Sequence, residues 1–189
     1  MSKERLRELI KEVHDRHGYF HDEFKRRPRY FAKGRERPEI VNARSAFFDS
    51  FNRLVVGHLD PLRRDFEADP LRAVDDVIHF LEIDIPAYRC GYEKEWYLGK
   101  LKSVSLTSEQ QNRLKGIALD LVSKPHYRRE FRDWSRLMIV VADGPFIASL
   151  KTLSNSSEHF VQQNARRMLK TVLENRPDLR TDESSQFIS

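Results

Sequence analysis

The stretch PFIASLKTLSNSSEHFVQQNARRMLKTVL, residues 145–173, has the pattern of two short amphipathic helices separated by a polar turn. In the first helix, apolar residues recur at the spacing that places them on one face: Phe146, Ile147, Leu150 and Leu153. The second carries a wider apolar stripe, which consists of Val161, Ala165, Met168, Leu169, Val172 and Leu173. Neither helix is long enough to be stable alone, so the pattern predicts that they pack as a pair.

The same stretch resembles a HEAT repeat. Pro145 begins a helix with spaced leucines, a polar turn follows, and Val161, Ala165 and Leu169 then recur four residues apart with basic residues between them. Asn155 stands where the family often has Asp in the turn, and Gln162 where it often has Arg after the valine. HEAT repeats are helix pairs that stack into a solenoid, so the resemblance implies that each pair covers the apolar face of its neighbour.

A second helix pair is predicted over residues 108–124 and 127–142, about one repeat length upstream. Thr107 and Gln110 have the spacing of a capping box at its start. The two HEAT-like pairs together cover residues 107–175, less than half of the chain. An irregular helical bundle with one well-formed hairpin is the alternative interpretation.

The composition favours an all-α fold. The 189 residues are 33% charged and include only 7 glycines, and β-branched residues seldom alternate with polar ones, so strands have little support. We predict one helical domain over residues 1–177, in which N-terminal helices (1–104) pack on the two HEAT-like pairs to form a short curved domain. Residues 178–189 have no periodicity and are predicted to be a flexible tail.

The N-terminal half has its own helix signals. An apolar seam is predicted along a first helix over residues 3–25, formed by Leu6, Ile10, Val13, His17, Phe20 and Phe24. Pro38 is predicted to start a second helix, which Gly57 ends and in which Phe47, Phe48 and Phe51 face the core. Asp69 is predicted to cap a later helix with Leu71 on its buried side.

The cellular location is predicted from the cysteine content and from the lengths of the apolar stretches. The single cysteine, Cys90, cannot form an intramolecular disulfide, which favours a reducing compartment. The residues from Met1 have no apolar core of signal-peptide length, and the longest apolar run, 137–142, is too short to cross a bilayer. We expect a cytoplasmic protein without a membrane partner.

The stretch KRRPRYFAKGRER, residues 25–37, combines a high density of basic residues with two aromatic ones. Guanidinium groups match phosphate oxygens and aromatic rings can stack on bases, which makes this stretch a candidate nucleic-acid contact. The candidate residues are Arg26, Arg27, Arg29, Tyr30, Lys33, Arg35 and Arg37. The alternative is a solvated basic connector anchored by its two rings.

A ridge of arginines forms the second candidate contact with nucleic acid. It is predicted along the first turns of a helix that becomes strongly apolar towards its C-terminal end. The residues of this ridge are Arg128, Arg129, Arg132 and Arg136.

Three histidines on the first predicted helix have side chains that a metal ion could use: His14, His17 and His21. No cysteine pair or HExxH motif accompanies them, so the competing interpretation is one core histidine with two surface neighbours. Arg16 and His21 have a spacing similar to the active-site motif of HEPN ribonucleases. Arg53–His58 and Arg72–His79 match the same loose spacing, as chance alone predicts for a chain this rich in arginine.

The function predicted from these patterns is a non-enzymatic protein–protein interaction module that uses the surface of stacked helices. The net charge of +5 also permits nucleic-acid binding through residues 25–37 and 128–136, which is the first alternative. A helical metal-dependent or nucleolytic enzyme is the second. No catalytic residue and no cofactor is predicted, and the expected partner is another protein, with nucleic acid as the other possibility.

Overall fold

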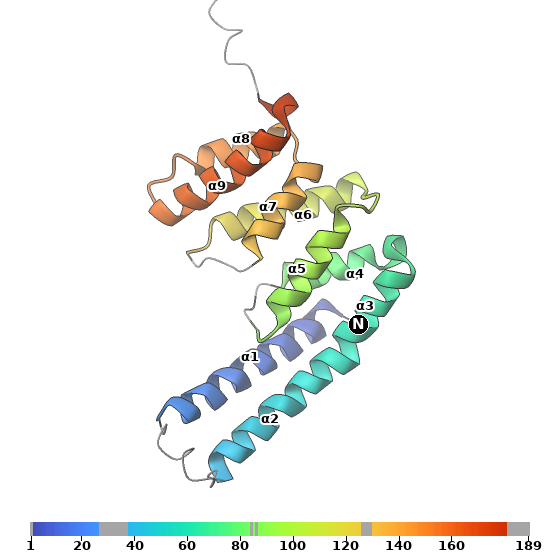
Figure 1. The fold of residues 1–189 in the computed structure, drawn as a ribbon, viewed down its shortest axis with the longest axis vertical. Coiled ribbons are helices and arrows are strands. Elements are labelled where there is room, and N and C mark those ends of the chain that lie inside the picture. The colour runs from blue at the N-terminus through green and yellow to red at the C-terminus, as the bar shows by residue number, and fades with distance from the viewer. Residues whose placement is uncertain (1, 27–37, 84, 86, 126–129, 181–189) are drawn as a thin grey trace, which may run out of the picture. The chain divides into compact units, whose positions relative to one another are not determined.

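A computed structural model of the chain describes residues 2–26, 38–83, 85, 87–125 and 130–180. These residues form helices and no strand, which confirms the predicted all-α fold (Figure 1). None of the helices in this part of the chain has an apolar run that could cross a membrane. Two compact units divide the chain, Met1–Glu93 and Lys94–Ser189. The prediction of one domain with a subdivision near residue 105 stays a prediction.

The first unit is built on a hairpin of two long helices, α1 (Lys3–Arg26) and α2 (Pro38–Leu54), which lie side by side (Figure 1). The apolar residues of α1 recur every three or four positions and therefore share one side of the helix. Each helix buries one apolar side. The buried residues are Leu6, Leu9, Ile10 and Val13 on α1 and Ile40, Phe47 and Leu54 on α2. Burying a side chain of this size stabilises the fold by about 1.5–3 kcal/mol.

The second helix does not end at Gly57, contrary to the prediction. Val55–Leu59 form a π-helical segment that continues directly into α3 (Asp60–Ala68). A glycine ends a helix by adopting a left-handed conformation, and Gly57 has no positive φ. Leu54 and Leu59 on either side are buried, and this burial outweighs the cost of about 0.5–1 kcal/mol for a glycine inside a helix.

Helix α4 (Pro70–Glu82) starts as predicted. The carboxylate of Asp69 accepts a hydrogen bond from the Arg72 N–H (3.2 Å), and Pro70 occupies the first helical position. The prediction that Leu71 is buried is wrong, because its side chain is 64% exposed. The buried side of α4 contains Val77 near its centre, and Leu71 lies about 120° away from Val77 around the helix axis.

The connection between α4 and α5 (Cys90–Leu101) packs against the first unit, as its apolar composition predicts. Ile83 and Ala87 are buried, and so is Cys90, the first residue of α5. Arg89 has a φ of 63°, a left-handed conformation that is uncommon for a residue with a side chain. Its neighbour Tyr88 is exposed.

The second unit contains α6 (Ser108–Val122), α7 (Phe131–Val141), α8 (Gly144–Leu153) and α9 (His159–Asn175). Within this unit α6 packs on α7, α8 packs on α9, and α9 also packs on α7. The HEAT-like arrangement of these helices stays a prediction. The buried Asn164 of α9 donates to the backbone carbonyls of Val122 (3.4 Å) and Lys124 (3.5 Å). Asp143, which caps α8, accepts a hydrogen bond from Lys115 of α6.

The chain that follows α9 was predicted to be a tail. Its first residues, Pro177–Leu179, form a 3-10 turn (η3), and the Arg176 side chain contacts the Asp178 carboxylate at 2.7 Å. Residues 181–189 of the predicted tail lie outside the described residues.

The capping box at the start of α6 gives a direct stability test. The Gln110 N–H donates to the Thr107 hydroxyl (3.2 Å), and the Thr107 N–H donates to the Gln110 side chain (3.0 Å). We expect Thr107→Ala to lower the free energy of unfolding of the second unit by about 1 kcal/mol. Both tryptophans of the chain lie in this unit, so tryptophan fluorescence during urea unfolding reports on it. Ser105→Ala, at an exposed position before the cap, is the control, and equal effects of the two changes would contradict the prediction.

Candidate functional site

A cluster of aromatic rings covers one side of the α1–α2 hairpin. The ring of Tyr88 stacks on His17 (5.1 Å between centroids) and meets Phe47 (5.4 Å) and Phe51 (5.6 Å) at an edge. Tyr88 comes from the connection before α5, so this loop brings a third segment to the hairpin. We define the aromatic cluster as His17, Phe20, Phe24, Phe47, Phe48, Phe51 and Tyr88.

Three rings of the aromatic cluster remain largely open to solvent. Phe24 is 41% exposed, Phe48 48% and Tyr88 43%. The prediction that Phe24 and Phe48 belong to the packed core is therefore wrong. Phe48 lies about 100° around α2 from the buried Phe47, and Phe24 lies in the last turn of α1. Each exposed ring lies beside a buried or half-buried ring of the cluster. Exposed apolar surface of this kind is typical of a binding site.

Basic side chains line α1 on the same side as the aromatic cluster. With 100° per residue, the exposed residues within about 120° of His17 in one rotational direction are Lys3, Gly18 and five further basic residues. We call these last five the basic stripe: Arg7, Lys11, His14, His21 and Lys25. The acidic residues of α1 lie farther around the helix, between about 140° and 240°: Glu4, Glu8, Glu12, Asp15, Asp22 and Glu23. Arg5 and Arg16 lie at about 240–260°, beside these acidic residues, and Lys11 contacts Asp15 at 2.5 Å, so the separation of charges on this helix is partial.

The opposite flank of the hairpin is held by ion pairs. Glu12 contacts Arg16 of the same helix (2.8 Å) and Arg53 of α2 (2.6 Å). Arg16 also donates to the backbone carbonyl of Ala46 (3.4 Å). Arg16 and His21 lie about 140° apart around α1, so this helix does not bring together the pair whose spacing is similar to a nuclease motif.

The one histidine of the aromatic cluster, His17, is neutral at pH 7. Burial lowers the pKa of His17 below its ordinary value, and the neighbouring His21 and His14 lower it further. The His17 ring lies 6.2 Å from that of His21. His14 and His21 are exposed. Within the described part of the chain, no group of three or more His, Cys, Asp or Glu side chains is arranged to hold a metal ion.

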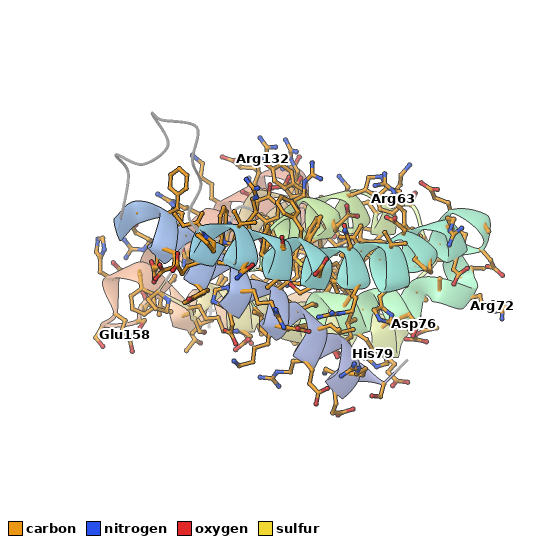
Figure 2. The ribbon with its side chains drawn as sticks, turned by 90° about the horizontal axis from the view of Figure 1, so that it is seen from below. Arg63, Arg72, Asp76, His79, Arg132 and Glu158 are labelled. Atoms are coloured by element: carbon orange, nitrogen blue, oxygen red, sulfur yellow. The ribbon has the colours of Figure 1, made fainter. Side chains whose placement is uncertain are left out.

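The predicted arginine ridge is described only in part. Arg132 (labelled in Figure 2) and Arg136 are exposed on α7, and Arg136 contacts Asp133 at 3.4 Å. Arg128 and Arg129 lie outside the described residues. The two described members belong to a helix whose buried side carries Phe131 and Trp134.

The predicted basic segment lies almost entirely outside the described residues. Lys25 is exposed at the end of α1, and the backbone of Arg26 forms the last residue of that helix. Six of the candidates lie outside the described residues: Arg27, Arg29, Tyr30, Lys33, Arg35 and Arg37.

The sequence contained a signal for the basic stripe that the predictions did not use. The spacing of Arg7, Lys11, His14, His21 and Lys25 follows the three-and-four rhythm of one helix side, interrupted only by Gly18. The contribution of Tyr88 had no such signal, because a loop residue has no periodicity that relates it to a distant helix.

The lowered pKa of His17 predicts how the stability of the first unit depends on pH. The folded state binds a proton at His17 less readily than the unfolded chain, whose value is near 6.5. The contribution of neutral His17 is thus fully present above about pH 6.5 and is lost as the pH falls through the folded-state pKa. We expect His17→Phe to reduce the loss of stability between pH 7 and pH 5, measured by hydrogen exchange of α1 and α2 amides.

Some decline should remain in His17→Phe, because burial, followed by the charge of Arg5, also lowers the pKa of His58. The control is His159→Phe, at an exposed position of the second unit. An unchanged pH profile in His17→Phe would contradict the assignment of this effect to His17.

Compared with known proteins, the chain matches no protein-family model, no curated protein and no solved structure.

Proposed function

We propose that this protein is a non-enzymatic binding module and that its ligand is single-stranded nucleic acid. The observation that carries the proposal is the position of exposed aromatic rings beside Arg7, Lys11 and Lys25, the cations of the basic stripe, on one side of the α1–α2 hairpin. Rings of this kind stack on bases, and the cations contact the phosphates that connect the bases. Neither interaction requires a particular base sequence.

The dimensions of the basic stripe suit an extended strand. From Arg7 to Lys25 the helix rises by about 27 Å, at 1.5 Å per residue. Tyr88 stacks on His17 of the same helix, and Phe48 lies next to Phe47 on the neighbouring helix. A backbone that follows α1 would therefore place its bases over the aromatic cluster. Each stacked base contributes about 1–3 kcal/mol to binding.

The predicted basic segment supports the same ligand. The basic stripe ends at Lys25, and the chain continues directly into residues 26–37, whose sequence combines arginines with Tyr30 and Phe31. Basic and aromatic side chains thus occur together both on the α1–α2 hairpin and in the sequence that follows α1.

A protein partner, expected from the HEAT-like resemblance of residues 107–175, is the competing ligand. That expectation depends on a general property of stacked helices, whereas the face of the first unit has a specific chemistry. An acidic peptide would satisfy the basic stripe but would lack the planar bases that stack on Phe48 and Tyr88. The following experiments separate the two ligands.

Charge reversal on the basic stripe tests the electrostatic part of the proposal. We expect the full chain to bind a fluorescein-labelled 20-nucleotide single strand in fluorescence anisotropy, with a slope of about −3 for log affinity against log salt if four phosphates are contacted. Arg7→Glu combined with Lys25→Glu should weaken binding at least tenfold and reduce the slope. Lys102→Glu combined with Lys170→Glu makes the same change in net charge at exposed positions of the second unit and is the control.

Removal of an exposed ring tests the stacking part. We expect Phe48→Ala to weaken binding of the same oligonucleotide by about 1–3 kcal/mol with little change in the salt slope, because a base loses its stacking surface. Leu71→Ala removes an exposed apolar side chain of the same unit and should leave binding unchanged. Binding of poly-glutamate that is tighter than binding of the oligonucleotide, or oligonucleotide binding that salt does not affect, would contradict the proposed function.

A further inference from the structure

The connection before α5 contains a tight turn at residues 87–90, in which an arginine has a left-handed backbone. The Cys90 N–H donates to the Ala87 carbonyl (3.1 Å), which closes the turn. Arg89 is the third of the four residues and has a φ of 63°. A positive φ at the third residue alone is characteristic of a type II turn, where glycine or asparagine is the usual residue. The chain thus has an arginine at a position that favours glycine.

The backbone of this turn does not need the arginine side chain. In the left-handed conformation a Cβ atom lies close to the following carbonyl oxygen, so any side chain is less favourable here than glycine. Among the described residues other than glycine, Arg89 is the only one with a positive φ. Its carbonyl accepts from the N–H groups of Tyr92 (3.0 Å) and Glu93 (3.4 Å), which a glycine carbonyl would do equally well. The unfavourable conformation indicates that the side chain has a role outside the turn.

The positive charge of Arg89 is not used in an ion pair within the described part of the chain. The residue is exposed, and no described acidic side chain contacts it. Glu93, one helical turn further on, contacts Arg63 at 3.8 Å. Glu82, at the end of α4, contacts Lys3 at 2.6 Å. The nearest described acidic residues along the chain thus have other cations as partners, and the guanidinium group of Arg89 can bind an external anion.

Tyr88, the residue before Arg89, holds the turn on the aromatic cluster. Its ring is stacked on His17, with 5.1 Å between the centroids and 25° between the planes. Phe47 and Phe51 meet the same ring at steep angles, 82° and 70°. Contacts with both helices of the hairpin therefore fix the ring, although 43% of Tyr88 remains exposed. Neighbouring Cα atoms lie 3.8 Å apart, so an open ring and a charged guanidinium group leave the backbone next to one another.

We propose that Tyr88 and Arg89 together bind one nucleotide, whose base stacks on the ring and whose phosphate contacts the guanidinium group. A nucleotide combines a planar base with an anionic phosphate, and the two neighbouring side chains offer one partner to each. This inference rests on the proposed function, because it assigns a further contact to the same ligand. It adds a cation from the connection before α5 to those of the basic stripe, and it gives the left-handed arginine a role.

The test uses the full chain and the same labelled 20-nucleotide single strand. We expect Arg89→Gln to weaken binding about fivefold or more and to reduce the magnitude of the salt slope by about 0.7, the contribution of one phosphate contact. Arg89→Lys keeps the charge and should bind within about threefold of the parent chain. Arg72→Gln removes an exposed arginine of α4 (labelled in Figure 2) and should change neither quantity. Equal effects of Arg89→Gln and Arg72→Gln would overturn the proposal.

Arg89→Gly separates binding from folding. Glycine relieves the unfavourable backbone conformation, so the midpoint of thermal unfolding should stay the same or rise, whereas binding should weaken as much as in Arg89→Gln. An arginine that only stabilised the turn would give the reverse result. A lower midpoint with unchanged affinity would therefore overturn the proposal.

A double-variant cycle tests whether the two side chains contact the same nucleotide. Tyr88→Leu removes the stacking ring, and a nucleotide that no longer stacks also loses its position beside Arg89. We expect Tyr88→Leu combined with Arg89→Gln to weaken binding by less than the product of the two separate effects. The full product, measured with variants whose thermal unfolding shows an intact fold, would assign the side chains to different nucleotides and overturn the proposal.

The proposed function and this inference fail in different ways. If the Arg89 variants bind like the parent chain while Arg7→Glu combined with Lys25→Glu weakens binding, the inference is wrong and the proposed function stands. If the parent chain does not bind the single strand, both are wrong.

Discussion

The first unit depends on the burial of one apolar side of α1 against α2. Ile10 and Val13 on α1 and Phe47 on α2 are almost inaccessible to solvent, so the rotation of α1 about its own axis is fixed. This rotation also fixes the direction in which every other side chain of α1 projects. The basic stripe lies on the side that carries the aromatic cluster, and the acidic residues lie on another side. Core packing thus decides which charges adjoin which rings.

The same packing explains why some aromatic residues are buried and others are not. Phe47 and Phe51 lie about 40° apart around α2 and share one side, whereas Phe48 lies about 100° from Phe47 and projects from another. Phe47 takes the buried position, Phe51 is half-buried under the Tyr88 ring, and Phe48 is left in solvent. The excess of aromatic residues over available core positions creates the exposed surface.

Local signals predicted much of the fold. The helical class, the Asp69 cap and the Thr107–Gln110 capping box follow from contacts between residues three or four positions apart, which a sequence displays directly. The continuation of the helix through Gly57 and the exposure of Phe48 depend on what lies opposite in space, and periodicity contains no such information. The residues of the basic stripe can be found in the sequence, but only the structure shows that they lie beside the aromatic cluster. A pocket in the first unit joins residues 2–6 with residues 57–65 and 76–79, so no single stretch could have revealed it.

The π-helical turn between α2 and α3 absorbs one residue without changing the sides that these two helices bury. A π-turn accommodates one residue more than an α-helical turn would, without breaking the rod. Loss of one residue from Val55–Leu59 would restore regular α-helical geometry and leave α3 in nearly the same rotation relative to α2. Leu54 and Phe66, both buried, would keep their places. A one-residue deletion should therefore be tolerated within this five-residue segment better than within α2 or α3, where it would turn a buried side by about 100°.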